Sequence, residues 1–317
     1  MLPGYHRDRI ISLLRGVILL VLVLPSSNAK AQVNFRAVRG YLVVVPAYVN
    51  GLGPFDFLVD TGTNTTLIDP GLAQQMGGKP VGSQLLRTLT GSETVLRYSL
   101  GSLTVGLHSV FGLSALAQDM KTVQGVDPRI RGVLGLDFLL EFGFLLDYGH
   151  QQIELYDLGS APDFAKGTRL PIQVVSGRIL VSATSDSSVS GSWSLAVDSG
   201  IPKMAIFEDR IRELLASPRD ESDKIRVTTN LSSLSTRVVS VRHLALANLQ
   251  LRDVEVVVLP PSPGIQRGIE DGLLPASFFR WILVNARRGY AILDLDHKGR
   301  FQNLGTGRSR MPVKRTQ

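Results

Sequence analysis

Two aspartates in this chain stand at the same kind of place, directly after an apolar strand and directly before a turn that contains glycine. The first is Asp60 in the segment Phe57–Thr63 (FLVDTGT), and the second is Asp198 in Leu195–Gly200 (LAVDSG), at an offset of 198 − 60 = 138. Glycine lets backbone approach closely at such a turn. If the two loops meet, one carboxylate can take a proton from water while the other donates a proton to the bond under attack. We therefore predict that Asp60 and Asp198 meet across a pseudo-twofold axis and activate one water molecule.

Charge repulsion makes such a pair hold a proton. Two unit charges ~3 Å apart repel by about 332/(20 × 3), or ~5 kcal/mol, at an effective dielectric constant of ~20. That energy is on the order of four pK units, so the pair is expected to keep one proton at acidic and near-neutral pH. The two groups then titrate as a unit, and the residues alone do not say which of them is the acid and which is the base.

The segments that must position these aspartates occur as a sequence repeat. Tyr41–Asp60 aligns without a gap with Ile179–Asp198, so that Val43 meets Val181, and each aspartate is predicted to follow a hairpin. An apolar segment that begins at Gly132 recurs at Gly272, and its offset of 272 − 132 = 140 is close to the 138 between the aspartates. Two landmarks that keep nearly one offset predict two homologous halves.

Short helices and apolar closing strands complete each half. One helix is predicted to begin at Asp69-Pro70 and to stop at Gly77, because an N-cap and a helix-starting proline precede an apolar face. Its counterpart is predicted over 208–216, before Pro218. The closing strands are predicted over 144–148, 152–155, 281–284 and 290–293.

A polar hairpin lies between the helix and the closing strands in each half. The first covers 87–96 and is predicted to turn at Gly91, and the second covers 225–239 and is predicted to turn within 230–235. Polar tips on apolar strands are typical of a mobile cover over a cleft. For the second hairpin, an ordinary hairpin that faces solvent fits the residues equally well.

Composition favours an all-β globular chain. The 317 residues are 44% apolar and 19% charged, and short runs of valine, leucine and isoleucine are punctuated by 31 glycines and 16 prolines. Cysteine is absent, which excludes a disulfide and a thiol nucleophile. The five histidines are scattered without a partner at a zinc-like spacing, so we predict no metal and no cofactor.

The N-terminus has the pattern of a signal peptide over 1–31. A basic lead precedes the nine-residue apolar core Gly16–Leu24, and Ala29–Ala31 supplies small residues around a cleavage point before Gln32. The core is too short to span a bilayer comfortably, so we expect an exported protein, periplasmic or secreted, without stable membrane insertion after cleavage. An uncleaved anchor or a buried strand is the alternative.

Net charge argues against a nucleic-acid partner, and the repeat sets the predicted domain boundaries. The leader carries four basic residues and one acid, so the net charge of +7 falls to +7 − 3 = +4, which is too mild to indicate a nucleic-acid partner. The predicted domains are the leader over 1–31, a first lobe over 32–160, a second lobe over 167–297 and a basic tail over 298–317.

The sequence resembles the aspartic peptidases, and among them the bacterial retropepsin-like aspartyl proteases, arranged as a single two-lobed, pepsin-like chain. The resemblance covers roughly Val33 to Asp296. It rests on the segments Val59–Thr63 (VDTGT), Val133–Phe138 (VLGLDF), Val197–Gly200 (VDSG) and Gly272–Leu274 (GLL). It implies a bilobal all-β fold of two homologous barrel-like lobes with a few short helices. It also implies an endopeptidase that cuts an extended peptide with a dyad sharing one proton, which is a known property of that family.

The resemblance assigns roles to the neighbours of the two aspartates. Thr61 and Ser199 are expected to hydrogen-bond across the lobe interface and lock the two turns together. Gly62 and Gly200 are expected to let backbone N–H groups reach the carboxylates. Thr63 is expected to hydrogen-bond the outer oxygen of Asp60.

Two further elements follow from the resemblance. The first polar hairpin would be the flap over the substrate, and Leu134-Gly135 would pack behind the first loop. The flap residues are Thr90, Gly91, Ser92 and Glu93. The expected partner is a peptide or protein substrate, and a monomer suffices to bring both aspartates together.

The second half departs from the family pattern at two places. Ile201 stands where a serine, threonine or alanine is expected, so Asp198 loses a possible outer hydrogen bond. Pro275 replaces a glycine, which removes a donor and fixes φ. Two alternatives therefore stay open: a non-catalytic peptide-binding pseudoprotease with a degenerate second lobe, or a homodimeric retropepsin that uses only Asp60.

Overall fold

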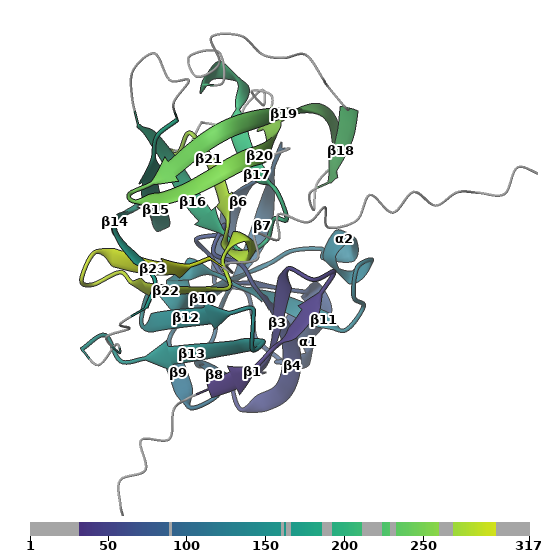
Figure 1. Cartoon of the computed structure of the whole chain (residues 1–317). Helices are drawn as coiled ribbons and strands as arrows, with labels where there is room; N and C mark the ends of the chain where they lie inside the picture. Colours follow the sequence, from purple (N-terminus) through teal and green to yellow (C-terminus); the bar gives the residue numbers. More distant parts are fainter. Residues whose placement is uncertain are drawn as a thin grey trace, which may run out of the picture. The chain divides into compact units, whose positions relative to one another are not determined.

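The computed structural model (Figure 1) describes residues 32–88, 91–159, 162, 166–185, 192–210, 224–228, 233–259 and 269–295. The predicted leader over 1–31, the predicted tail over 298–317, Thr90 of the flap and 211–216 of the second predicted helix lie outside these residues. Among the described residues, no helix has the length and apolar character needed to cross a membrane. The described part belongs to one compact unit, so the lobe boundaries at 160 and 167 stay predictions.

Asp60 follows a hairpin of two long strands, β3 (Leu42–Val49) and β4 (Leu52–Val59), which pair antiparallel. Valine and leucine crowd these strands, and their stiff or bulky side chains favour a pleated, buried surface. The turn is Asn50-Gly51, and its φ angles of 52° and 77° belong to a tight two-residue hairpin loop. The hairpin therefore delivers Asp60 directly at the end of β4.

The matching hairpin of the second half corrects the gapless alignment. Val45 pairs with Phe57 in the first hairpin, and Val181 pairs with Leu195 in the second. Phe57 and Leu195 each stand three residues before their aspartate, so Val181 corresponds to Val45 and not to Val43. The alignment is wrong by two residues in the first strand, because the connection between the strands is two residues longer in the second half. The second hairpin consists of β15 (Arg178–Ala183) and β16 (Trp193–Asp198).

A parallel strand supports each aspartate-bearing strand. Strand β11 (Ile130–Leu134) lies beside β4, and β21 (Gly272–Pro275) lies beside β16. A Cβ atom on Gly132 would overlap the ring of Phe57, and one on Gly272 would overlap the carbonyl oxygen of Ala205. The repeated glycine is therefore required by the close approach of neighbouring groups in both halves.

The two halves extend into separate sheet regions. The first half forms a sheet in the order β6-β7-β10-β5-β11-β4-β3-β8-β9, with β2 paired to β3. The second half continues in the order β14-β15-β16-β21-β17-β20-β19-β18. The remaining strands of the first are β2 (Arg36–Val38), β5 (Leu67–Ile68), β6 (Gly82–Thr88), β7 (Gly91–Ser99), β8 (Ser102–Val105), β9 (His108–Phe111) and β10 (Ser114–Ala117). Those of the second are β14 (Thr168–Val175), β17 (Met204–Phe207), β18 (Lys224–Thr228), β19 (Ser233–Leu246) and β20 (Leu249–Leu259).

Six strands join the halves, three from each, in the order β1-β13-β12-β22-β23-β14. At the centre β12 and β22 lie side by side and antiparallel (Figure 1). Phe144 pairs with Val284, its own counterpart at an offset of 284 − 144 = 140, so the pseudo-twofold axis passes through this pair. The strands are β1 (Gln32–Asn34), β12 (Gly143–Asp147), β13 (Gln152–Tyr156), β22 (Trp281–Asn285) and β23 (Tyr290–Asp294), and the last four confirm the predicted closing strands.

The helices are short. The first predicted helix is confirmed as α1, where the Asp69 carboxylate caps the N-terminus by accepting from the N–H groups of Gly71 (2.8 Å) and Leu72 (3.1 Å). In the second half, residues 208–210 are helical. The helical elements are α1 (Pro70–Gln75), α2 (Lys121–Gln124), α3 (Leu136–Leu139) and the 3₁₀ turn η1 (Ala276–Phe278).

Both polar hairpins form. Thr88 of β6 pairs with Gly91 of β7, so Gly91 begins the returning strand and the prediction that it forms the turn was wrong. In the second hairpin Thr228 pairs with Ser233, so 233–235 of the predicted turn range belong to β19, and 230–232 lie outside the described residues.

One apolar core runs through both halves and confirms the all-β bilobal fold. Its members come from both hairpins, from the supporting strands and from the shared six-stranded region. The largest side chains that are fully buried include Phe57, Phe138, Phe144 and Phe279. Burial of this kind stabilises a fold by about 1.5–3 kcal/mol for each such side chain. The predicted fold class, two related β lobes with few short helices, is therefore confirmed.

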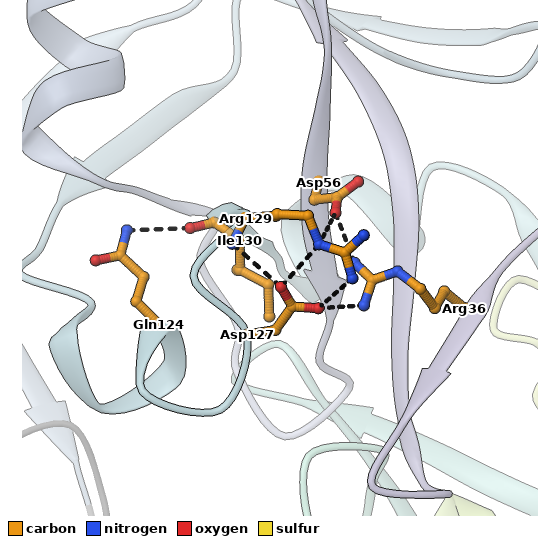
Figure 2. Close-up of polar contacts among 6 residues, drawn as sticks. All are labelled: Arg36, Asp56, Gln124, Asp127, Arg129 and Ile130. Atoms are coloured by element: carbon orange, nitrogen blue, oxygen red, sulfur yellow. Dashed lines mark hydrogen bonds and ion pairs between the residues drawn. The ribbon is translucent and has the colours of Figure 1, made fainter.

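A cluster of ion pairs contacts β4 at Asp56 in the first lobe (Figure 2). Arg36 of β2 pairs with Asp127 and donates to Asp56 of β4 at 2.6 Å. Arg129 donates to the same Asp127 carboxylate from Nε (3.0 Å) and Nη2 (3.1 Å). These bonds, first among them those from Arg129, hold the pKa of Asp127 well below its usual value. The cluster ties β2, β4 and the segment that leads into β11 together, four residues before Asp60.

Candidate active site

Two hydroxyl groups lock the acidic loops together. The Thr61 hydroxyl accepts from the Ser199 N–H (3.0 Å) and donates to the Val197 carbonyl (2.9 Å). The Ser199 hydroxyl accepts from the Thr61 N–H (3.0 Å) and donates to the Val59 carbonyl (2.8 Å). Both residues are almost completely buried. The four reciprocal bonds join the halves where the prediction placed the contact, through backbone groups rather than directly between the hydroxyls.

The two carboxyl groups meet at this lock. Asp60 accepts the Gly62 N–H at 2.8 Å, and Asp198 accepts the Gly200 N–H at 2.7 Å. The carboxyl groups of Asp60 and Asp198 lie close enough together for each to act on the pKa of the other. A Cβ atom on Gly62 would overlap the Asp198 carboxylate, and one on Gly200 would stand 3.1 Å from Asp60 Oδ1. Both glycines are therefore needed for the carboxyl groups to approach.

Electrostatics leave one proton on the pair. Burial raises the pKa of Asp198 to about 8, and the negative charge of Asp60 adds to the rise. Burial also raises the pKa of Asp60, although the Gly62 N–H, the Arg178 charge and the Asp198 carboxyl group oppose the rise. The pair therefore keeps one proton and the two groups titrate as a unit. For the mechanism we take Asp198, whose pKa is raised to about 8, as the protonated member and Asp60 as the ionised one.

Three side chains beyond the predicted set face this pair. Arg178 donates from Nη1 to the Gly62 carbonyl at 2.7 Å, and its charge acts on both aspartates. The pKa of Tyr148 is raised by burial first and then by the charges of Asp198 and Asp60. Burial, with a contribution from Asp198, likewise raises the pKa of Tyr41 although Arg39 opposes it. Sequence reasoning missed all three, and only Arg178 left a signal, as a charge at the start of an apolar strand.

The first loop rests on a polar support. The Asp60 N–H donates to the Leu134 carbonyl at 3.0 Å, and a Cβ atom on Gly135 would approach the Thr65 carbonyl carbon to 2.6 Å, so this pair packs behind the loop as predicted. Asp137 accepts from the Thr66 N–H (2.9 Å) and hydroxyl (2.7 Å) and so braces the strand that follows the loop.

One expected bond in the first loop is not made. The Thr63 hydroxyl donates to the Thr65 carbonyl at 3.4 Å, and a single hydroxyl hydrogen cannot also reach the outer oxygen of Asp60. The prediction of a Thr63–Asp60 side-chain bond is therefore wrong for this arrangement. The cause is the loop's own geometry, in which the Thr63 N–H already turns back to the Asp60 carbonyl at 3.4 Å.

The second loop rests on an apolar support. Ile201 packs against a small cluster that includes Leu180 and Leu273, so no hydroxyl stands beside the outer oxygen of Asp198 from this position. Pro275 pairs with Asp198 in the ladder and cannot donate. In the first half the matching Gly135 N–H donates to the Thr66 hydroxyl at 3.3 Å. Methionine replaces that threonine at position 204, so the second half has lost donor and acceptor together. The hydroxyl of Ser277, which matches Asp137 by the offset of 140, is buried there without a hydrogen-bond partner among the described residues.

The flap residues lie at the start of β7. Gly91, Ser92 and Glu93 follow the hairpin loop, and Thr90 lies outside the described residues. Glu93 accepts from Gln118 Nε2 at 2.8 Å, and Gln118 is 2% exposed at the end of β10. The structure therefore ties one strand of the hairpin to the lobe beneath it, while the role of these four residues as a flap stays a prediction.

No metal site is visible in the described part of the chain. There, no three histidine, aspartate or glutamate side chains gather closely enough to hold an ion. Each carboxyl group of the dyad accepts a backbone N–H, which is a donor and cannot bind a cation. Asp60 and Asp198 are thus arranged for proton exchange. Two related β lobes that each bring one aspartate to a shared interface define a bilobal protein with a carboxyl dyad.

Comparison with known families agrees with this class. The family model described as aspartyl protease matches residues 45–138 and 190–278, which together make up more than half of the chain. One match contains Asp60 and the other contains Asp198. The chain belongs to the aspartyl protease family, in its retropepsin-like form with two lobes in one chain. No curated protein matches it.

Proposed function

We propose that this protein is an exported aspartic endopeptidase that hydrolyses peptide bonds with the Asp60–Asp198 dyad. The convergence of the two carboxyl groups carries the proposal: the Thr61–Ser199 lock joins their loops, and the backbone of each loop packs against the aspartate of the other. Membership of the aspartyl protease family supports peptide-bond hydrolysis as the reaction class. The leader pattern over 1–31 supports export to the periplasm or beyond.

The chemistry follows from the protonation state. A water molecule between the carboxyl groups gives a proton to the ionised Asp60, and its oxygen bonds to the carbonyl carbon of the peptide. Asp198 gives its proton to the carbonyl oxygen, which leaves a neutral tetrahedral diol and moves the charge to Asp198. In the second step the C–N bond breaks as a diol hydroxyl loses its proton to Asp198. The proton on Asp60 goes to the leaving nitrogen, so atoms and charge balance over the cycle.

The fixed geometry of the loops supplies the rest of the catalysis. The Gly62 and Gly200 N–H groups hold one oxygen of each carboxylate, and the Thr61–Ser199 lock holds the backbones. Groups that are positioned before the substrate arrives need no reorganisation during the reaction. The chain is proposed to act as a monomer, because each half contributes one aspartate to the same lock.

The test is cleavage of an unfolded protein substrate by the purified full chain, with new termini identified by mass spectrometry between pH 3 and pH 8. The proposal predicts internal cleavage that a statine-containing peptide blocks, and a loss of at least about 10³-fold for Asp60→Asn, since acid–base catalysis contributes about 10²–10⁴-fold. Binding of the statine peptide without any cleavage would instead identify a peptide-binding pseudoprotease. Activity found only in a dimer would identify the homodimeric alternative.

A further inference from the structure

Arg178 crosses from the second lobe to the loop that carries Asp60. It is the first residue of β15, and its Nη1 donates to the Gly62 carbonyl at 2.7 Å. The N–H of the same Gly62 donates to Asp60 Oδ1 at 2.8 Å. The single residue Gly62 therefore connects Arg178 to the Asp60 carboxylate. A displacement of Arg178 would move the Gly62 N–H that donates to Asp60.

A buried carboxylate fixes the position of Arg178. Glu270 is 4% exposed, and its Oε1 lies 3.6 Å from Arg178 Nε. Its other oxygen has no hydrogen-bond partner among the described residues. A buried carboxylate is costly unless a cation compensates it, so Glu270 holds the guanidinium against the loop.

The first lobe has no such pair. Register through the two hairpins places Leu42 where Arg178 stands, since Val44 pairs with Leu58 and Leu180 pairs with Ala196. The offset that relates Gly132 to Gly272 also places Ile130 where Glu270 stands. Leu42 and Ile130 are 6% and 0% exposed and belong to one apolar cluster. An apolar pair in one lobe thus corresponds to an ion pair in the other, and only the ion pair contacts an acidic loop.

The charge of Arg178 reaches both aspartates. It lowers the pKa of Asp60 and that of Asp198 against the effect of burial, whereas Glu270 acts on neither directly. The other titratable groups that face the dyad are Tyr41, near the start of β3, and Tyr148, which follows β12. Both tyrosines have raised pKa values and are neutral in the working range, so Arg178 is the cation that acts on the pair.

We propose that Arg178, held by Glu270, is a positioning residue that clamps the Asp60 loop from the opposite lobe and sets the pH range in which the dyad carries one proton. The inference rests on the proposed function of the dyad. A cation beside the pair favours its ionised forms, so it moves both titration steps towards lower pH. The ion pair thereby adapts the site to more acidic conditions than burial alone would allow.

The decisive variant copies the first lobe into the second: Arg178→Leu with Glu270→Ile. Replacement of a buried ion pair by apolar residues of similar volume is often neutral or stabilising, so this double variant is expected to fold. The readout is ¹³C NMR of labelled aspartate carboxyl groups in the full chain, with Asp60 and Asp198 assigned through their asparagine variants. Both titration steps of the Asp60–Asp198 dyad should move to higher pH in the double variant.

Glu270→Gln gives a weaker form of the same expectation. It keeps the Arg178 charge but removes the carboxylate that holds the guanidinium against the Asp60 loop, so both titration steps should move to higher pH by less than in the double variant. Arg252→Met is the matched control, because Arg252 is exposed on β20 and acts on neither aspartate, and it should leave both steps unchanged. In a cleavage assay, the double variant should lose activity about threefold or more on the acidic limb and gain on the alkaline limb.

The outcomes separate the two proposals. Titration steps that stay in place in a folded double variant, or that move to lower pH in either variant, overturn the role of Arg178. A change in unfolding free energy without a shift of the steps would mean that the pair is structural only. Absence of cleavage by the unaltered chain would overturn the proposed function but not the titration result.

Discussion

The loops of Asp60 and Asp198 make the same bonds on the side that faces the dyad and different ones on the side that faces away. Towards the dyad, each aspartate accepts the N–H of the glycine two residues on, and each neighbouring hydroxyl crosses to the other lobe. Away from it, Thr66 and Asp137 form a polar support for the first loop, whereas Ile201 packs the second into an apolar cluster. The two halves have therefore kept the same contacts where those contacts set the distance between the two carboxyl groups, and have diverged elsewhere.

A second contrast lies at the helix that follows each loop. In the first lobe Arg131 pairs with Asp69, the N-cap of α1. In the second lobe Asp271, at the position that matches Arg131, pairs with Arg210 at 2.7 Å. The two ion pairs occupy related places with their charges exchanged. The requirement at this place is therefore a pair of opposite charges and not a particular residue on either strand.

The largest expected effect comes from crowding the dyad. Gly62→Ala should reduce cleavage by about 10²-fold or more, because its Cβ atom would overlap the Asp198 carboxylate and small displacements of reacting groups have effects of that order. Gly200→Ala should cost less, because its Cβ atom would stand 3.1 Å from Asp60 Oδ1. Turnover of both variants measures the difference, with Gly159→Ala as control, since nothing lies within 4 Å of that Cβ position. Equal losses would contradict the unequal crowding.

Loss of the Thr61 hydroxyl and loss of the Ser199 hydroxyl should lower the free energy of unfolding by similar amounts. Thr61→Val removes two buried hydrogen bonds and leaves an N–H and a carbonyl unpaired, which should lower the free energy of unfolding by about 2–4 kcal/mol. Ser199→Ala should have a similar cost, because its bonds mirror those of Thr61. Denaturant unfolding measures both, and Thr94→Val on the exposed face of β7 is the control. A large loss of unfolding free energy in only one of these two variants would contradict the equivalence of the two hydroxyls.

The ion-pair cluster at the base of β4 should make the first lobe sensitive to acid. Asp127→Asn should lower the free energy of unfolding by about 1–2 kcal/mol near neutral pH, since hydrogen bonds from two arginines are lost. The folded pKa of Asp127 lies below its ordinary value of 3.8, so its contribution is complete above that value and is lost as the pH falls through the folded pKa.

Denaturant unfolding of Asp127→Asn at pH 7 and at pH 3 checks this prediction. The difference from the unaltered chain should shrink at the lower pH. Asp119→Asn, which breaks an exposed pair with Lys121, is the control and should show no comparable loss. A difference that stays constant with pH would show that the Asp127 charge contributes nothing to the stability of the first lobe.

The smallest expected effect comes from making the second loop resemble the first. Ile201→Thr copies Thr63, whose hydroxyl donates to the Thr65 carbonyl and not to Asp60, so the dyad's titration steps should stay close to their places. The pH profile of cleavage measures any shift, and the rate should change by less than about threefold at any pH. A larger shift towards lower pH would show that a hydroxyl at position 201 bonds the outer oxygen of Asp198.

Much of this architecture could be predicted from the sequence because it repeats. The acidic loops, the glycines at 132 and 272 and the closing strands each recur at nearly one offset, and periodic apolar strands tolerate few other folds. The register of the first strand could not be predicted, since a shift of two residues keeps the same face inward and leaves the apolar pattern unchanged. The strand position of Gly91 was missed for a different reason, because glycine occurs at the start of a strand as readily as in a loop.

The wider site depended on contacts that no local pattern contains. Thr61, Ser199 and the two glycines could be predicted because they adjoin the aspartates in sequence. Arg178 lies 116 residues from the glycine that it contacts, so only the folded chain brings them together. The bond expected of Thr63 is not formed because a hydroxyl has one hydrogen and the Thr65 carbonyl accepts it.

The most direct test of the account is turnover by Asp198→Asn as a monomer of verified size and unfolding free energy. The second lobe has lost the polar support of its loop, so this variant asks whether its carboxyl group still takes part. We predict a folded monomer whose cleavage rate falls at least about 10³-fold, as for Asp60→Asn. Undiminished cleavage by that monomer would contradict the shared-proton dyad.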